Sequence, residues 1–438
     1  MSRRGFVLTA AGAGAGLLLS GCGGSSSSEA TGGGETTTAG DGGQAYTGPK
    51  VDLQFWNGFT GGDGPFMRDM VTQFNTENEN IKVKMVVQQW ADYYQKVPTA
   101  VASGRGPDVG VMHVDTLATN AARNVIIPLD DVAESLKLAK DDFAATIWDA
   151  GIYKDQRYGI PLDMHPLGFY YNTQHLEKAG LSEAPMTRDE HDAALEKLKA
   201  AGFDKPFWQS STWPGHLMFM SLLWQFGGDL YNEDATQTAW NSDAGVEALT
   251  WQRKLVDDGY SPPNVANDAD YIAFKNEKNS FHWDGIWQTQ DLAKTSLPWA
   301  VAPLPQIGSQ KAAWAGSHNL VIMRQKTQNE DKLQASKVFL NWISEHSIDW
   351  AKGGQVPARN SVRNSAEFKQ LKNQSILAEQ IDVVHFPPAL PGIADAQAEM
   401  EAAVNRAILG KQSPKEALDS GASKANKLLE ENKKKYGA

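Results

Sequence analysis

Apolar and polar residues alternate in two short stretches near the start of the body of the chain. One stretch runs from Val51 to Phe55 and the other from Ile81 to Val87. This period of two is that of a half-buried β-strand. Between them, apolar residues recur at helical spacing over residues 66–74. A strand, a helix and a strand in succession predict a βαβ unit, and hence a parallel sheet.

Strand and helix patterns continue to alternate along the rest of the chain. Residues 92–103 predict a helix that stops at Gly104, and residues 107–112 predict the next strand. Thr187 and Glu190 predict a capping box at the start of a later helix. Apolar spacing predicts three more helices, over residues 214–226, 330–345 and 414–438. The predicted fold class is α/β, and 438 residues are enough for two lobes.

Polar residues gather where the predicted parallel strands end. Residues 56–64, with the sequence WNGFTGGDG, follow the first strand, and His113 follows the third. In such sheets, ligands bind beyond the carboxyl ends of the strands. We therefore expect a binding site at this edge, with four candidate residues: Trp56, Asn57, Asp63 and His113.

The first residues of the chain have the pattern of an export signal. Arg3 and Arg4 precede an apolar run of small residues that is too short to span a bilayer, so residues 1–21 are predicted to be a signal peptide. The sequence Leu-Ser-Gly-Cys that ends at Cys22 is similar to the lipobox of bacterial lipoproteins, which predicts lipidation of that cysteine. Paired arginines also occur in twin-arginine signals, so both export routes stay open.

The segment after the signal is rich in Gly, Ser and Thr. Residues 22–48 contain almost no large apolar side chain, so burial cannot offset the entropy of ordering them, and we expect a flexible tether. A lipid on Cys22 would anchor the body to the outer face of the cell membrane.

Composition narrows the classes of partner. The net charge of −11 disfavours nucleic acid, because an acidic surface repels phosphate groups. The only cysteine is Cys22, so no disulfide can form within the chain. Several of the 14 tryptophans stand beside Gly, Asn or Asp. Flat rings next to short polar groups suit sugar recognition, with core packing as the alternative role.

Short motifs at a specific order and spacing carry a family resemblance. They are FWN at 55–57, ASGRGPDV at 102–109, YGIP at 158–161, GFYYN at 168–172, FGG at 226–228, WDGIW at 283–287, GSH at 316–318 and GGQVPAR at 353–359. Together they resemble the extracellular solute-binding proteins of the maltose-binding type, which serve ABC sugar importers. The resemblance covers residues 51–429.

This resemblance implies a two-lobed, periplasmic-binding-protein-like fold of type II, in which each lobe is a mixed sheet flanked by helices. It divides the chain into lobe I, residues 49–164 plus 317–355, and lobe II, residues 165–316 plus 356–438. It also implies hinge crossings over residues 162–166, 314–318 and 354–360. The implied function is capture of an oligosaccharide or glycoside for the permease subunits of an ABC importer, by a monomer that uses no cofactor.

A sugar presents apolar C–H faces and rims of hydroxyl groups, so its site needs flat rings and carboxylates. The candidate stacking residues are Trp56, Trp213, Trp283, Trp287 and Trp314. We favour Trp283 and Trp314, which adjoin a turn and a crossing. The other candidates are Asp63, Asp163, His165, Asp284 and Arg359. Asp163 and His165 form a polar pair inside an apolar hinge, where burial without a partner would be costly, so we expect them to contact the ligand.

Three histidines raise the alternative of a metal site. His113, His165 and His318 all fall at predicted edges of the cleft and could bind zinc if they converged. No His-x-His or His-x-x-x-His pair occurs near them, so we expect no metal and interpret the three as ligand-binding residues. A polyol phosphate is a further non-sugar alternative.

An extracellular glycoside hydrolase is the competing class of function. Two of the candidate aspartates could flank a glycosidic bond. However, the body of the chain contains no Gly-x-Ser-x-Gly elbow, no His-Glu-x-x-His motif and no catalytic cysteine. We therefore expect a binding protein and not an enzyme.

Overall fold

The predicted βαβ unit opens the first of two mixed sheets. The computed structural model describes residues 46–135 and 138–437, so the predictions for the signal peptide, Cys22 and most of the tether lie outside the described residues. The first sheet has the strand order β2-β1-β3-β11-β6. Its strands are β1 (Val51–Asn57), β2 (Ile81–Val87), β3 (Val109–His113), β6 (Ile160–Pro161) and β11 (His318–Ile322). β1 is parallel to β2 and β3, whereas β11 is antiparallel to β3 and β6.

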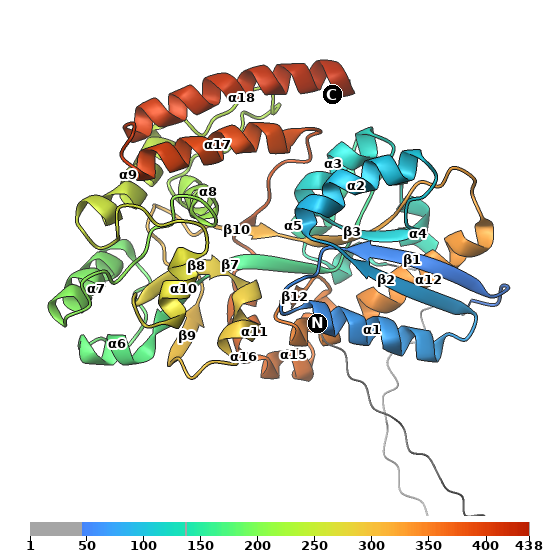
Figure 1. Ribbon diagram of the computed structural model, residues 1–438, viewed down its shortest axis with the longest axis horizontal. Helices are drawn as coiled ribbons and strands as arrows, with labels where there is room; N and C mark the ends of the chain where they lie inside the picture. The colour runs from blue at the N-terminus through green and yellow to red at the C-terminus, as the bar shows by residue number, and fades with distance from the viewer. Residues whose placement is uncertain (1–45, 136–137, 438) are drawn as a thin grey trace, which may run out of the picture. The chain divides into compact units, whose positions relative to one another are not determined.

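Helices cover both faces of this first sheet (Figure 1). They are α1 (Gly64–Glu77) and α12 (Glu330–Glu345) on one face and α2 (Trp90–Ala102) and α3 (Val114–Ala122) on the other. Phe55 of β1 packs edge to face against Phe339 of α12, with ring centroids 5.2 Å apart. On the opposite face, Met112 packs in a cluster with Tyr93 of α2 and Leu117 of α3. Helices therefore cover both faces of the sheet at β3, whereas β2 at the edge keeps one face exposed.

The second sheet is built around one long strand, β7. It has the order β12-β7-β10-β13, and β8 and β9 also pair with β7. The strands are β7 (Asp163–Asn172), β8 (Phe281–Gly285), β9 (Trp299–Ala302), β10 (Ala313–Gly316), β12 (Val356–Pro357) and β13 (Val384–His385). All partners of β7 are antiparallel to it, whereas β10 and β13 are parallel. This sheet is also mixed.

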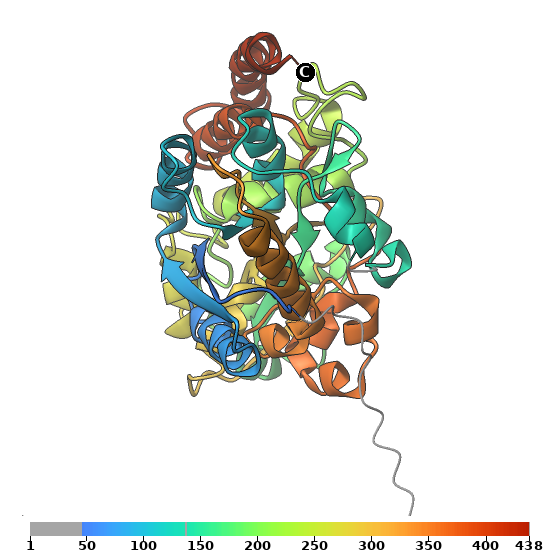
Figure 2. The same ribbon diagram turned by 90° about the vertical axis from the view of Figure 1, so that its right-hand side faces the viewer.

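A second set of helices packs around β7 and its neighbours. It comprises α6 (Thr173–Lys178), α7 (Arg188–Ala200), α8 (Gly215–Gln225), α9 (Asp243–Asp257), α10 (Ala269–Lys275), α11 (Thr289–Leu292), α16 (Lys372–Ala378), α17 (Ile393–Ile408) and α18 (Pro414–Tyr436). α7 begins with the predicted capping box of Thr187 and Glu190. Every residue of α8 is buried, and α17 and α18 lie side by side in both views (Figures 1 and 2).

Shorter elements complete the described chain. They are α4 (Asp130–Ser135), η1 (Lys140–Asp142), α5 (Ala145–Asp149), β4 (Ile152–Tyr153), β5 (Gln156–Arg157), η2 (Ile286–Gln288), α13 (Ser347–Lys352), α14 (Asn360–Arg363) and α15 (Ala366–Gln370). No helix in the described ranges is both long enough and apolar enough to cross a membrane.

The chain passes between the two sheets three times, and these passages lie next to one another. Leu162 separates β6 from β7, Ser317 separates β10 from β11, and residues 353–355 lead from α13 into β12. The backbone N–H of Leu162 donates to the carbonyl of His318 (2.8 Å), and the N–H of Ala358 donates to the carbonyl of Leu162 (3.0 Å). Leu162 is therefore hydrogen-bonded to the segments that follow the other two connections, at His318 and Ala358.

Candidate functional site

A cavity of about 610 Å³ lies beside these connections. Its volume is within the range of typical small-molecule sites, roughly 300–1,000 Å³. One part of its wall comes from the first sheet: the loop after β1, the start of α2 and the ends of β3 and β11. The other part comes from α8, η2, β10 and α17 around the second sheet. The carboxyl ends of β1 and β3 thus open into the cavity, as predicted from the strand pattern.

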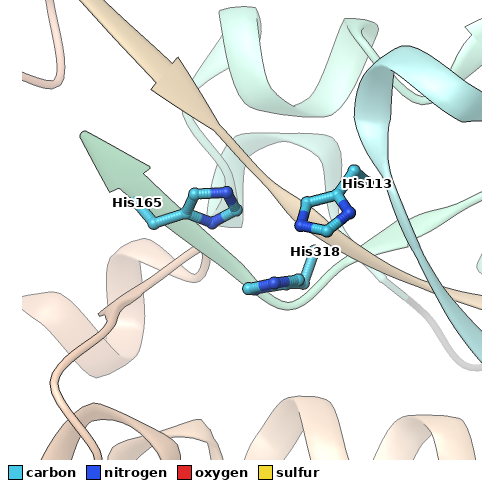
Figure 3. Close-up of side chains that lie close together, drawn as sticks. All are labelled: His113, His165 and His318. Atoms are coloured by element: carbon cyan, nitrogen blue, oxygen red, sulfur yellow. The ribbon is translucent and has the colours of Figure 1, made fainter. Parts of the chain in front are cut away.

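Three histidines from different strands meet in the cavity wall (Figure 3). His113 ends β3 and His318 begins β11, and the antiparallel register places these two residues directly opposite each other. His165, on β7, is paired with Gly316 of β10. The ring centroid of His318 lies 4.3 Å from that of His165 and 4.8 Å from that of His113. Strand pairing therefore brings together residues that are far apart in the sequence.

Asp163 holds two of these rings from behind. Its Oδ1 accepts from Nδ1 of His165 (3.1 Å), and its Oδ2 accepts from Nδ1 of His318 (2.7 Å). The indole N–H of Trp350 and the backbone N–H of His318 also donate to this carboxylate. Burial alone would raise the pKa of Asp163, but the two histidines and these hydrogen bonds hold it well below its ordinary value. Asp163 therefore carries a negative charge that positions the rings.

Tyr94 holds the third ring. Its hydroxyl group lies 2.8 Å from Nδ1 of His113 and accepts the backbone N–H of the same residue at 2.8 Å. Burial lowers the pKa of His113 well below its ordinary value, and His318 and His165 lower it further. Burial also lowers the pKa of His165. His113 and His165 are therefore neutral at pH 7.

Three tryptophans line the cavity next to His165, and we call them the tryptophan wall: Trp213, Trp287 and Trp314. The rings of Trp213 and Trp287 have centroids 5.7 Å apart, and those of Trp287 and Trp314 are 6.4 Å apart. Trp213 is 38% exposed, which is unusual for so large an apolar side chain. These rings offer apolar faces to whatever enters the cavity.

Four carboxyl groups also line the cavity: Asp63, Asp115, Asp291 and Glu401. Burial raises the pKa of Asp63 and of Glu401, and it raises the pKa of Asp115 to about 6. No lysine or arginine lines the cavity within residues 46–135 and 138–437. The wall therefore offers acceptors and apolar rings but no fixed positive charge.

The predicted site residues divide into two groups. The structure brings seven of them to the cavity wall: Asp63, His113, His165, Trp213, Trp287, Trp314 and His318. Asp163 lies directly behind this wall with no exposed surface, so it contacts histidines and not the cavity. The expectation that the polar pair in the hinge faces the ligand therefore applies to His165, whereas Asp163 has a positioning role.

Two candidates on strands, Trp283 and Asn57, lie in the interior, and a third, Trp56, is partly buried. Trp283, which the sequence analysis favoured, is 1% exposed and packs against Trp251 and Phe169. Trp56 packs against the cluster formed by α2 and α3. Asn57 is fully buried, and its side-chain oxygen accepts the backbone N–H of Phe59. None of the three side chains lines the cavity, because each is engaged by these packing or hydrogen-bond contacts.

Two charged candidates are also occupied by structural contacts outside the cavity. Asp284 accepts from the side chains of His282 (3.1 Å) and Gln288 (2.8 Å). Arg359 donates to the hydroxyl group of Ser344 at 2.8 Å and lies 3.5 Å from the carboxylate of Asp142. Neither side chain lines the cavity, and their partners explain why each charge can be buried.

Several cavity residues were missed at the sequence level. Trp90 and Tyr94 lie four residues apart in the first turns of α2, directly after β2, so their position beyond a parallel strand was a usable signal. His216 on α8 and Glu401 on α17 lie 3.3 Å apart in the wall. No local pattern could have identified this second pair, because it depends on how two distant helices pack.

The expectation of no metal rested on the absence of closely spaced histidines, and that reason was wrong. One ligand atom from each of His113, His165 and His318 lies within 4.8 Å of those of the other two. The three residues come from β3, β7 and β11, so their convergence is a product of the fold.

Comparisons with known proteins agree on one family. The chain is 22% identical over 384 residues to a galactooligosaccharide-binding protein of Bacillus subtilis (strain 168), covering 82% of this chain and 85% of that one. It is 25% identical over 303 residues to a maltotriose-binding protein of Pyrococcus abyssi (strain GE5 / Orsay), covering 66% of this chain and 62% of that one. The GacH receptor of Streptomyces glaucescens GLA.O, whose structures include a complex with acarbose, matches with a TM-score of 0.78 at 21% identity and covers 87% of this chain and 99% of that one.

This structural match confirms the two-lobed α/β fold expected from the resemblance. The model of the family described as bacterial extracellular solute-binding protein matches residues 69–375, which is more than half of the chain. Proteins of this family bind solutes outside the cytoplasm and are not enzymes. The chain therefore belongs to the bacterial extracellular solute-binding protein family.

Proposed function

We propose that the cavity binds a neutral carbohydrate and that the chain delivers it to an ABC importer. The single observation that carries this proposal is the composition of the cavity wall: Trp213, Trp287 and Trp314 lie in one wall together with four carboxyl groups, and no lysine or arginine lines the described cavity. Rings stack on sugar C–H faces, and carboxylates accept pairs of hydroxyl protons.

No lysine or arginine lines the described cavity wall, and this favours a neutral sugar over a polyol phosphate as the ligand. A phosphate group needs arginine, lysine or a helix N-terminus to offset its charge. The starts of α1, α2 and α3 lie at the cavity, but each carries an acidic residue: Asp63, Asp92 and Asp115. Asp63, Asp115 and Glu401 would instead repel it. The wall therefore favours a ligand without negative charge.

The relatives support the sugar class. A maltotriose-binding protein and a galactooligosaccharide-binding protein cover most of the body of the chain, and the structurally similar GacH receptor has been crystallised with acarbose. The volume of about 610 Å³ leaves room for more than one sugar ring. We therefore propose an oligosaccharide or glycoside as the ligand.

The three connections between the sheets supply the mechanism of delivery. Lobe I, residues 49–164 plus 317–355, and lobe II, residues 165–316 plus 356–438, would turn about the connections at Leu162, Ser317 and residues 353–355. A ligand that contacts both walls stabilises the closed arrangement. The permease subunits of the importer would then recognise the closed monomer.

We further propose that the chain is a lipoprotein. Removal of residues 1–21 would leave Cys22 as an acylated N-terminal residue, with residues 23–48 as a tether to the outer face of the membrane. Growth with radiolabelled palmitate should label the chain, whereas Cys22→Ser should release it unlabelled into the soluble fraction. Labelling of Cys22→Ser would contradict this proposal.

A thermal-shift screen tests the carbohydrate proposal. The purified chain would be melted with neutral mono-, di- and oligosaccharides and with glycerol 3-phosphate. A ligand at about 100 times its Kd stabilises the native state by roughly 2.7 kcal/mol, so a neutral sugar should raise Tm by several degrees. A shift with the phosphate alone would contradict the proposal, and hydrolysis products in the same samples would favour a glycoside hydrolase.

A further inference from the structure

The three histidines of the cavity wall have the arrangement of a metal-binding set. One ring nitrogen from each of His113, His165 and His318 lies within 4.8 Å of the other two. Figure 3 shows the three rings around a common space, with each ring arriving from a different strand. Three nitrogens bound at 2.0–2.1 Å to a tetrahedral ion lie roughly 3.3 Å apart. Small ring rotations, of about 1 Å at the nitrogens, would therefore close the set around an ion.

The hydrogen bonds on the far side of the rings determine which nitrogen faces this space. A carboxylate that accepts four donors is ionised and cannot itself donate, so Nδ1 of His165 and Nδ1 of His318 both carry the proton shared with Asp163. A neutral imidazole protonated at Nδ1 has its lone pair on Nε2. Asp163 thus sets two rings in the tautomer that coordinates a metal through Nε2.

Tyr94 can set the same tautomer in the third ring. Its oxygen already accepts the backbone N–H of His113 and lies 2.8 Å from Nδ1 of the same residue. A hydroxyl oxygen has two lone pairs, so it can accept a second hydrogen bond from a proton on Nδ1. Nε2 of His113 is then the free nitrogen as well.

The space in front of one Nε2 is kept open by a glycine. A Cβ atom on Gly316 would lie 2.1 Å from Nε2 of His165, closer than any real contact. No donor pairs with Nε2 of any of the three rings within the described part of the chain. Each Nε2 lone pair is therefore available to a ligand in the cavity, and a metal ion can accept all three.

The surroundings also match those of known metal sites. Metal-binding histidines commonly donate their second ring N–H to a carboxylate, which fixes the ring and strengthens the ligand. Trp90 packs on the other side, with its ring centroid 4.4 Å from that of His113 and 5.7 Å from that of His318. A hydrophobic shell of this kind limits access of water to the site.

We propose that His113, His165 and His318 bind one divalent transition-metal ion through their Nε2 atoms. Three imidazoles suit zinc and its neighbours, whereas calcium and magnesium prefer oxygen ligands. The three protein ligands leave a fourth position, as in open zinc sites, and this position faces the cavity. A solute or a water molecule would complete the coordination. The inference goes beyond carbohydrate binding and does not depend on it.

Metal titration of the full chain tests this inference. The chain, without a polyhistidine tag and after dialysis against EDTA, would be titrated with Zn²⁺ by calorimetry and with Co²⁺ by visible absorption. We expect one ion per chain and intense Co²⁺ bands of a four-coordinate site. A stoichiometry near zero, or weak bands typical of six-coordinate cobalt, would overturn the proposal.

Variants locate the ion. His113→Gln and His165→Gln should each weaken Zn²⁺ binding at least tenfold, whereas His346→Gln, at a half-buried histidine outside the cavity, should leave it unchanged. Asp163→Asn should weaken binding by about 10- to 100-fold, because the ring tautomer is no longer held. Circular dichroism would verify that each variant is folded, and should His165→Gln not fold, His113→Gln decides the test. Unchanged affinity in folded His113→Gln would contradict the proposal.

The metal experiment is independent of the sugar experiment. Zinc binding without any sugar-induced thermal shift would support the metal site and contradict the carbohydrate ligand. If a sugar raises Tm after EDTA treatment and no zinc binds, the carbohydrate ligand would be supported and the metal site contradicted.

Discussion

The two faces of the cavity are built in different ways. The histidine cluster, His113, His165 and His318, is held by hydrogen bonds to Asp163 and Tyr94. The tryptophan wall is held by ring contacts, and side-chain hydrogen bonds reach the backbone of its members: Ser210 donates to the carbonyl of Trp213, and the N–H of Trp314 donates to Ser221. The first face is fixed in orientation, whereas the second presents adaptable apolar area.

The two faces are therefore suited to two kinds of ligand contact, directional polar contacts on one face and stacking on the other. Polar groups aimed at a fixed point suit a small charged species or a defined hydroxyl group, because each ring has one orientation. Apolar rings tolerate several ligand shapes, because stacking has little directional demand. Changes to the histidine face should therefore alter stability strongly, and changes to the tryptophan wall should alter mainly ligand affinity.

The largest expected effect is on stability. Asp163→Ala removes a buried carboxylate and leaves the donors of His165, His318 and Trp350 without an acceptor. Removing one partner of such a buried network costs about 3–5 kcal/mol. Urea unfolding in the presence of EDTA measures this loss. The control is Asp349→Ala, which breaks a partly exposed ion pair with Lys352 and should lower the free energy of unfolding by less than about 1 kcal/mol. Equal losses of stability in the two variants would contradict the claim that the hydrogen-bonded histidine face carries more stability.

The next largest effect is a pH dependence of stability caused by His191, a buried histidine without hydrogen-bond partners. His191 is fully buried, neither ring nitrogen has a hydrogen bond, and burial lowers its pKa to about 3. Below pH 6.5 the unfolded state takes up a proton that the folded state refuses, so stability falls as pH decreases from 6.5 towards 3. The loss at pH 5 is roughly 2 kcal/mol. His191→Leu should remove this part of the pH dependence, as measured by urea unfolding at pH 5 and pH 7, and an unchanged difference would refute the assignment.

A smaller effect is expected on ligand affinity. Trp213→Ala removes a ring that is already 38% exposed, so stability should change by less than about 1 kcal/mol. Sugar affinity should fall by about tenfold, which corresponds to the loss of one stacking contact of roughly 1.4 kcal/mol. Trp342→Phe, on the outer side of α12, is the matched control and should bind as the unaltered chain does.

The smallest effect is the response to salt. A neutral ligand has no charge to screen, so its affinity should change by less than about twofold between 20 and 500 mM NaCl. Calorimetry at the two concentrations measures this. A tenfold fall in ligand affinity at the higher salt concentration would indicate a charged ligand and would contradict the proposal that the cavity binds a neutral one.

The fold of this chain can be predicted from its sequence better than the site can. Alternation at residues 51–55 and 81–87 identified β1 and β2 because those strands have one face more buried than the other. Trp283 and Trp287 could not be separated in the same way, because every residue of β8 is buried. Only the turn after Gly285 brings Trp287 to the cavity, and a Cβ on that glycine would collide with the Trp287 ring.

The histidine cluster shows why the convergence of distant residues in the cavity wall could not be predicted from the sequence. His318 lies opposite His113 because β11 returns from the second sheet to pair with β3. That pairing joins strands separated by about two hundred residues, and no local spacing encodes it. We expected Asp163 to contact the ligand because burial without a partner would be costly, but its partners are histidines of the chain itself.

Calorimetric titration with a neutral oligosaccharide and with the same sugar bearing one phosphate tests the central claim most directly. After EDTA treatment the described cavity wall offers rings and acceptors without a cation, so it should bind the neutral sugar at one site per chain and the phosphorylated sugar at least tenfold more weakly. Equal or tighter binding of the phosphorylated sugar would contradict the account.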